Sequence, residues 1–229
     1  MSRFITRDML QRVVNIKIAD QTATAFIIHK NNIPFLITAR HIFNGLGNGE
    51  NIDVEIRHAN SRWEPLSCRL YLHVNQNVDI AILAPVQYHS ENGVDDTDIL
   101  TSNNLILGQD AFFLGFPYCF AQEVGYAINK DFPLPLVKKA VISSMPNPSV
   151  NANFFLDGNN NLGFSGGPVC FFDKAGNKFK IAGVISGFVS DKIEMTSVLG
   201  WKSCIPINTG IIIASDIYFA NEILEKIIG

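Results

Sequence analysis

Apolar residues along this chain occur in short runs rich in Ile, Val, Phe and Thr, separated by Asn, Gly, Asp and Pro. The runs recur at intervals of roughly ten residues, a pattern typical of an all-β barrel or sandwich. Helical periodicity is nearly absent until the last 16 residues of the sequence, 214–229. The pattern therefore predicts an all-β protein with a helix at its C-terminal end.

The predicted strands fall into two comparable sets. The first set covers 13–19, 23–30, 33–39, 51–58, 63–73 and 78–84, with Asn31-Asn32 as a tight hairpin turn. The polar stretch 91–98 then predicts a linker. The second set covers 110–116, 122–128, 137–145, 153–156, 168–172, 179–188 and 193–199. We therefore expect one β unit over 1–100 and a second over 101–213.

The C-terminal segment 214–229 has a different spacing of apolar residues. Its apolar positions, from Ile217 and Phe219 to Ile228, recur at helical intervals, and Ser215 stands where a helix N-cap is expected. The segment is therefore predicted to be a helix.

Composition limits the classes of function. With 47% apolar residues in 229, the chain can bury a substantial core, which excludes disorder. The 18 basic and 21 acidic residues give a charge of -3, and no basic run could follow a phosphate backbone, so we expect no nucleic-acid partner. Neither a run of about 18 apolar residues nor a signal-peptide block is found. We therefore expect a cytoplasmic protein without a membrane partner.

The cysteines also favour a cytoplasmic protein. Cys68, Cys119, Cys170 and Cys204 form no C-x-x-C pair, so the sequence supports no metal site and points to no cofactor. We expect four free, mostly buried thiols, in agreement with a reducing compartment.

Three short strings carry candidate chemistry. They are TARH at 38–41, VDIAIL at 78–83 and GFSGGP at 163–168, and they supply His41, Asp79 and Ser165 in that order. A histidine, an acid and a glycine-flanked serine in this order match one arrangement of the catalytic triad. Taken singly, each string is also typical of a packed histidine, a turn-capping acid or a glycine-rich turn.

The serine string can be interpreted chemically. Gly163 permits a backbone bend in which the N–H groups of Gly163 and Ser165 converge on one point, as an oxyanion hole requires. The string also fits G-x-S-x-G, the turn of α/β-hydrolases, where the histidine follows the serine. All five histidines of this chain precede Ser165, which excludes that alternative.

Together the strings resemble those of trypsin-like, chymotrypsin-fold serine peptidases, and most closely the bacterial V8 and HtrA-type branches without a PDZ domain. The family carries its base in T-A-x-H, its acid in D-I-A-hydrophobic-L and its nucleophile in G-x-S-G-G-P. The resemblance implies two six-stranded antiparallel Greek-key barrels, with His41, Asp79 and Ser165 between them. It also implies a serine endopeptidase that acts on a protein or peptide substrate.

By the same resemblance, Asn159 and Asn160 lie at the base of the specificity pocket, where they offer no acid to attract Lys or Arg. Ser186, Gly187 and Phe188 are expected to bind the substrate backbone, and Phe188 to narrow the pocket.

The chain also departs from the family at Phe164, where secreted zymogens carry an acid that pairs with a new N-terminus. This implies an enzyme without N-terminal activation, with control by a regulatory partner left open. The alternative is a module of the same fold that binds a partner without cutting it.

Overall fold

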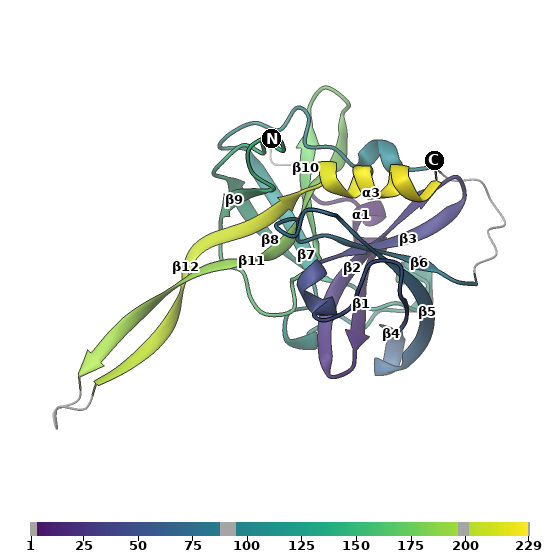
Figure 1. Cartoon of the computed structure of the whole chain (residues 1–229), viewed down its shortest axis with the longest axis horizontal. Coiled ribbons are helices and arrows are strands. Elements are labelled where there is room, and N and C mark those ends of the chain that lie inside the picture. Colours follow the sequence, from purple (N-terminus) through teal and green to yellow (C-terminus); the bar gives the residue numbers. More distant parts are fainter. Residues whose placement is uncertain (1–3, 88–94, 197–201, 229) are drawn as a thin grey trace.

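The computed structural model describes residues 4–87, 95–196 and 202–228. It consists of two closed six-stranded antiparallel β-barrels and a C-terminal helix (Figure 1). The predicted fold class is therefore confirmed.

The first barrel has the strand order β1-β2-β3-β6-β5-β4 and closes by pairing β1 with β4. Its strands are β1 (Val13–Ile18), β2 (Gln21–Lys30), β3 (Ile33–Thr38), β4 (Asn51–Arg57), β5 (Trp63–Leu72) and β6 (Ala81–Pro85).

The second barrel repeats this topology in the order β7-β8-β9-β12-β11-β10, and it closes by pairing β10 with β7. Its strands are β7 (Asp110–Gly115), β8 (Leu136–Ile142), β9 (Asn153–Asp157), β10 (Pro168–Asp173), β11 (Lys178–Thr196) and β12 (Lys202–Asp216).

Three apolar cores among the described residues hold this arrangement together. One fills the first barrel and includes Ile16 and Leu83, and another fills the second barrel and includes Phe154 and Phe171. The third lies between the barrels. Strands β2, β3 and β6 bury their outer faces there, against the second barrel and the C-terminal helix. Strands buried on both faces explain why these apolar runs show little alternation.

The C-terminal helix α3 (Tyr218–Ile228) lies on this third core and buries its apolar face there. It begins four residues later than predicted, because the segment 214–216 ends strand β12. Ser215 is not its N-cap: the N–H of Tyr218 donates instead to the Asp216 carboxylate at 3.1 Å. Within the described residues, no helix has the length and apolar character needed to cross a bilayer.

Several other predictions are corrected. Instead of a strand at 122–128, the chain forms a single bridge at Gln122 and the short helix α2 (Tyr126–Asn129). The helix α1 (Arg7–Gln11) was not predicted. The linker predicted at 91–98 lies partly outside the described residues, and its end leads into the 3₁₀ helix η3 (Thr97–Ile99). The remaining 3₁₀ helices are η1 (Arg40–Phe43), η2 (Ala59–Ser61) and η4 (Pro117–Cys119).

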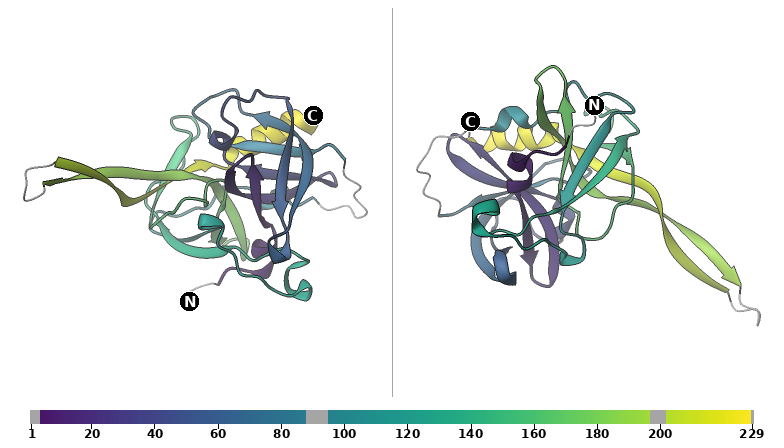
Figure 2. Two further views of the ribbon diagram at one scale, coloured as in Figure 1. Left: turned by 90° about the horizontal axis from the view of Figure 1, so that it is seen from below. Right: turned by 180° about the vertical axis from the view of Figure 1, so that it is seen from behind.

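The largest difference concerns the hairpin of β11 and β12. The runs at 179–188 and 193–199 were predicted as two strands, whereas β11 is continuous to Thr196; the end of the second run, 197–199, lies outside the described residues. The long partner strand β12 was not predicted. Their outer parts leave the barrel as a two-stranded ribbon (Figures 1 and 2). We call 190–196 of β11 and 202–208 of β12 the arm. It has no core of its own, so the apolar pattern that reveals a barrel strand is weak there.

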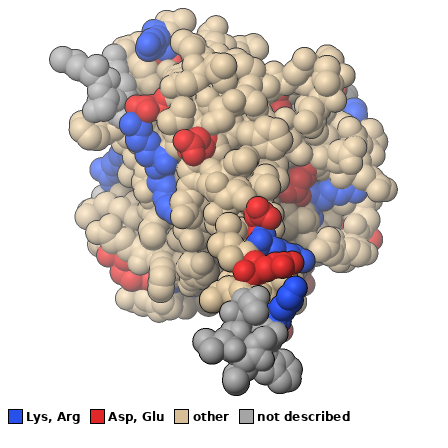
Figure 3. Space-filling view, turned by 90° about the vertical axis from the view of Figure 1, so that its left-hand side faces the viewer, with Lys and Arg blue, Asp and Glu red and all other residues tan. Residues whose placement is uncertain are grey.

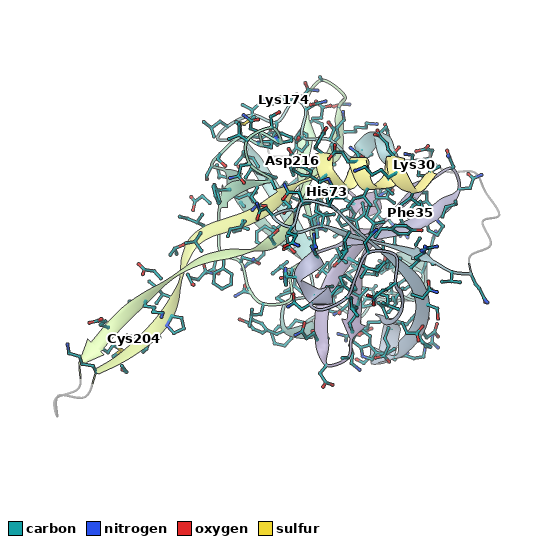
Figure 4. All side chains as sticks on the ribbon, viewed as in Figure 1. Lys30, Phe35, His73, Lys174, Cys204 and Asp216 are labelled. Atoms are coloured by element: carbon teal, nitrogen blue, oxygen red, sulfur yellow. The ribbon has the colours of Figure 1, made fainter. Side chains whose placement is uncertain are left out.

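All four cysteines are free, as expected. Only Cys68 and Cys170 are buried, whereas Cys119 is half-buried and Cys204 is exposed on the arm (Figure 4). The expectation of mostly buried thiols is therefore wrong for two of the four.

Candidate active site

His41 follows the end of strand β3, where the chain turns into η1. Phe43 anchors this turn in the first core, and the Arg40 guanidinium donates to the carbonyl of His73 at 2.9 Å. The turn is thus held on both sides while the His41 side chain remains 44% exposed. The imidazole is accessible at the rim of the first barrel.

Asp79 lies two residues before the start of β6, between the buried residues Val78 and Ile80. One carboxylate oxygen is 2.7 Å from His41 Nδ1, and the other accepts the backbone N–H of His41 at 2.8 Å. An ionised carboxylate can only accept, so Nδ1 carries the proton and Nε2 offers a lone pair. The hydrogen bond to Asp79 raises the pKa of His41 above 6.5, against the opposing effect of burial.

The second barrel supports this acid. The N–H of Asp79 donates to Ser215 Oγ at 3.3 Å, and Ser215 in turn donates to Asn153 at 2.8 Å. Ser186, expected from the sequence to bind substrate, lies with its hydroxyl 3.1 Å from that of Ser215. Ser215 therefore connects the acid to the expected substrate strand, a contact that the sequence pattern did not reveal because it favoured a helix cap.

Ser165 lies in the turn between β9 and β10. Among the described residues, the N–H groups of Gly163 and Ser165 donate no hydrogen bond. Their neighbours do donate, to carbonyl oxygens in and beside the turn: Phe164 to Asn161, Gly166 to Ile185 and Gly167 to Phe164, at 3.3, 2.8 and 2.8 Å. The turn therefore leaves unpaired the two backbone donors that the sequence proposes for an oxyanion hole.

Two glycines make this turn possible. Gly163 has a φ of +100°, and a Cβ there would lie 2.5 Å from the carbonyl oxygen of Phe116. Gly166 has a φ of +85°, and a Cβ there would lie 2.1 Å from both Thr24 O and Thr38 Oγ1. No side chain fits at either position, so the sequence requirement for glycine has a direct steric cause.

The contacts of the turn bring Ser165 to the first barrel. Its carbonyl accepts the N–H of Thr24 at 2.9 Å, and Gly166 lies against Thr38 and Ala39, which lead directly to His41. Within the described part of the chain, no hydrogen bond joins Ser165 Oγ to the imidazole. Such bonds are often long without substrate and shorten when it binds.

Lys138 on β8 holds the approach to the turn, a role that the sequence did not indicate. Its ammonium donates to the carbonyl of Asn159 and, at 2.7 Å, to Asn161 Oδ1. It also lies 5.7 Å from the ring centre of Phe164, which is fully buried in the second core. Burial lowers the pKa of Lys138. The Phe164 side chain thus lies in an apolar environment, and the Lys138 ammonium beside it is hydrogen-bonded to the loop.

Of the two asparagines expected at the pocket base, Asn160 is buried and Asn159 is exposed. Asn160 donates to the carbonyl of Gly187 at 3.1 Å, and its own carbonyl accepts from Asn208 at 2.6 Å. These bonds tie the loop before the serine to β11 and β12. Phe188 is half-buried on β11 opposite Ile212.

The described residues contain no group of three or more His, Cys, Asp and Glu side chains placed to hold a metal ion.

Comparisons with known proteins address the fold. No protein-family model and no curated protein match the chain. Among solved structures, Deg5 is 19% identical, with 96% of this chain and 92% of that chain covered and a TM-score of 0.57. The inactive form of the Rv3671c protease is 18% identical, with 97% and 91% covered and a TM-score of 0.54.

A serine-to-alanine mutant of Rv3671c from M. tuberculosis H37Rv, also in an inactive form, is 18% identical over 96% of this chain and 88% of that chain, with a TM-score of 0.50. At these identities the likeness shows the fold. The molecule has the chymotrypsin fold of trypsin-like proteases, as the sequence resemblance implied.

Proposed function

We propose that this protein is a serine endopeptidase that cleaves protein substrates with the triad His41, Asp79 and Ser165. The observation that carries the proposal is the double hydrogen bond of Asp79 to His41, on a rim that the serine turn contacts. This bond fixes the imidazole with Nε2 available as a base. The fold is shared with a known protease, which supports the same assignment.

The proposed reaction proceeds through an acyl-enzyme. Ser165 Oγ attacks the peptide carbonyl carbon while His41 Nε2 takes its proton, and Asp79 stabilises the resulting imidazolium. The carbonyl oxygen becomes an oxyanion that accepts hydrogen bonds from the N–H groups of Gly163 and Ser165. The C–N bond then breaks as His41 returns the proton to the leaving amine. Water repeats the sequence and releases the acid product.

The substrate backbone is proposed to lie along β11 at 184–188, as an added antiparallel strand. Neither Asn159 nor Asn160 offers a charge at the pocket base, and the nearby Lys138 already binds the loop carbonyl. We therefore propose a preference for small or medium uncharged residues at the cleaved position. Free cysteines suit a reducing compartment, so we place the enzyme in the cytoplasm.

The proposed enzyme needs no activation by a new N-terminus. Phe164 is buried in an apolar core and cannot form the ion pair that such activation needs. Lys138 supplies a positive charge from within the barrel and holds the loop on the N-terminal side of the serine.

A second candidate is a binding module of the same fold, or an enzyme that a protein partner switches on. The observation in its favour is that Phe188, expected to narrow the specificity pocket, lies half-buried on β11 opposite Ile212. In that case the cleft would hold a protein segment without cutting it.

A fluorophosphonate probe separates the candidates, because it modifies only an activated serine. We expect labelling of Ser165, identified by mass spectrometry, and loss of both labelling and proteolysis in Ser165→Ala. Ser186→Ala is the matched control: it removes a hydroxyl that contacts Ser215, and Ser165 should still be labelled. An intact protein that the probe does not label would favour the binding module.

A further inference from the structure

The arm lacks what a β-ribbon needs to be stable in water. One of its faces carries Ile193 beside Ile205, with 49% and 47% of these side chains exposed, and Met195, which is 51% exposed. An isolated two-stranded hairpin is marginal in water, whereas three or more strands with an apolar face are stable. We therefore expect the arm to pair with further strands, which must come from outside its own barrel.

The two edges of the arm are not equivalent. On β12, Pro206 stands opposite Lys192 and has no N–H to offer a neighbouring strand. The arm segment of β11 contains no proline. The N–H of Lys192 donates to the carboxylate of Asp191 at 2.7 Å, where a neighbouring strand would otherwise supply the acceptor. The edge of β11 is therefore the open one.

The hydrogen-bond pattern sets which residues face this edge. In an antiparallel ladder, alternate residues direct both N–H and C=O to the same side. Since Lys192 directs its N–H away from β12, the free edge also presents Ser190 and Glu194. The register is regular from Ser190 to Thr196, so a partner strand can use all of these groups.

We propose that two copies of this chain associate through these edges, with their β11 arms antiparallel and centred on Ile193 in a four-stranded sheet. In this register Lys192 of each copy lies opposite Glu194 of the other, and their backbone groups can exchange both hydrogen bonds. Ile193 faces its counterpart and contacts Met195 of the second copy diagonally.

The charges of Lys192 and Glu194 favour this register over the two registers whose twofold axis lies one residue away. A twofold axis at Lys192 would place two lysines opposite each other, and one at Glu194 would place two glutamates opposite each other, both of which are unfavourable. Neither side chain has an ion-pair partner within the described residues, and acidic and basic groups stand side by side near the end of the arm (Figure 3). The arm is thus self-complementary, which favours a second copy over an unrelated strand.

Charge reversal tests the proposal without reference to catalysis. Sedimentation velocity over a concentration series up to about 100 µM should show a dimer for the unchanged chain. Lys192→Glu alone, or Glu194→Lys alone, places like charges opposite each other twice and should weaken dimerisation about tenfold or more. Lys174→Glu, in an exposed turn far from the arm (Figure 4), is the control and should dimerise normally.

The decisive measurement mixes the two single variants. In Lys192→Glu, positions 192 and 194 are both acidic, and in Glu194→Lys both are basic. An equimolar mixture of these variants should therefore form a heterodimer. A chain that carries both substitutions should form the homodimer again. Unchanged thermal midpoints show that every variant is folded. An unchanged chain that stays monomeric, single variants that dimerise normally, or a mixture that stays monomeric would each overturn the proposal.

Discussion

The two barrels share one strand order but hold their functional groups by different means. In the first barrel, side chains do the positioning: the Asp79 carboxylate fixes both the ring and the backbone of His41. In the second barrel, the backbone does it: two glycines shape the turn and leave the N–H groups of Gly163 and Ser165 unpaired. In the proposed function, the repeated topology thus supplies a base on one side and a nucleophile with its donors on the other.

The barrels also differ in how far they extend. The longest strands of the first barrel have 10 residues, whereas β11 and β12 have 19 and 15. The extra length leaves the barrel as the arm (Figure 2). The first barrel closes on itself, while the second both closes and offers a free edge. The proposed dimer therefore uses the second barrel alone.

The largest expected effect removes the side-chain positioning of the first barrel. Asp79→Asn keeps the shape but offers an amide that can donate to Nδ1, so the imidazole takes the wrong tautomer for accepting a proton at Nε2. For this change in a triad the loss in kcat is about 10⁴-fold, and we expect a similar loss here. Steady-state kinetics on a peptide substrate would measure it.

Two other aspartates serve as matched controls. Asp53 accepts from Ser67 and Asp98 pairs with Lys178, both away from His41. Their Asn variants should keep nearly normal turnover. If Asp79→Asn stays active while either control is inactive, the acid of the triad is assigned wrongly.

The next effect breaks the backbone positioning of the second barrel. Gly166→Ala forces a Cβ within 2.1 Å of Thr24 O and Thr38 Oγ1 at a φ of +85°, where the turn meets the first barrel. Steric overlap and backbone strain together should lower the free energy of unfolding by roughly 3 kcal/mol. Urea denaturation would measure the loss.

Gly187→Ala is the control for this prediction, because a Cβ there meets nothing within 4 Å. Its free energy of unfolding should be almost unchanged. Equal stability of the two variants would contradict the close contact between the serine turn and the first barrel.

These contacts also show what the sequence could and could not predict. Barrel strands are visible because each buries at least one face, so the apolar runs outlined most of both barrels. Local strings identified His41, Asp79 and Ser165 because their neighbours have fixed steric requirements. The pairing of Asp79 with His41 agrees with that prediction, and the roles of all three residues stay predictions.

The features that the sequence did not reveal depend on distant contacts. Lys138 stands in a strand pattern like any exposed lysine, and only the fold brings it to the carbonyl of Asn159. Ser215 has the local pattern of a helix cap, yet the register of β12 places it beneath Asp79. Strand β12 was missed because its outer part, 202–208, packs on no core of its own and so lacks the apolar pattern of a barrel strand.

A smaller effect concerns Lys138, which we expect to be a positioning residue. Lys138→Met removes the two hydrogen bonds that hold the loop before Gly163, so the oxyanion donors should be less well ordered. We expect kcat to fall by roughly ten- to a hundredfold with little change in KM. The rate of fluorophosphonate labelling should fall in parallel, because it uses the same donors.

Lys139→Met is its neighbour and control. Lys139 pairs with Asp110 at the surface, where both side chains are at least half exposed. Its loss should leave kcat unchanged. Equal effects of the two substitutions would show that Lys138 contributes only to general stability.

The smallest effect is a shift of the pH profile, and it tests the His41–Asp79 pair directly. The carboxylate favours the imidazolium and so raises the pKa of His41 above 6.5. Because the mechanism needs the neutral ring, kcat/KM should fall as pH decreases through a midpoint above 6.5. In Asp79→Asn this support for the imidazolium is lost, so the midpoint of the residual activity should move down. A midpoint at or below 6.5 in the unchanged protein, or one that the substitution does not move, would mean that Asp79 does not set the basicity of His41. In that case the group that holds the ring must be sought elsewhere on the first barrel.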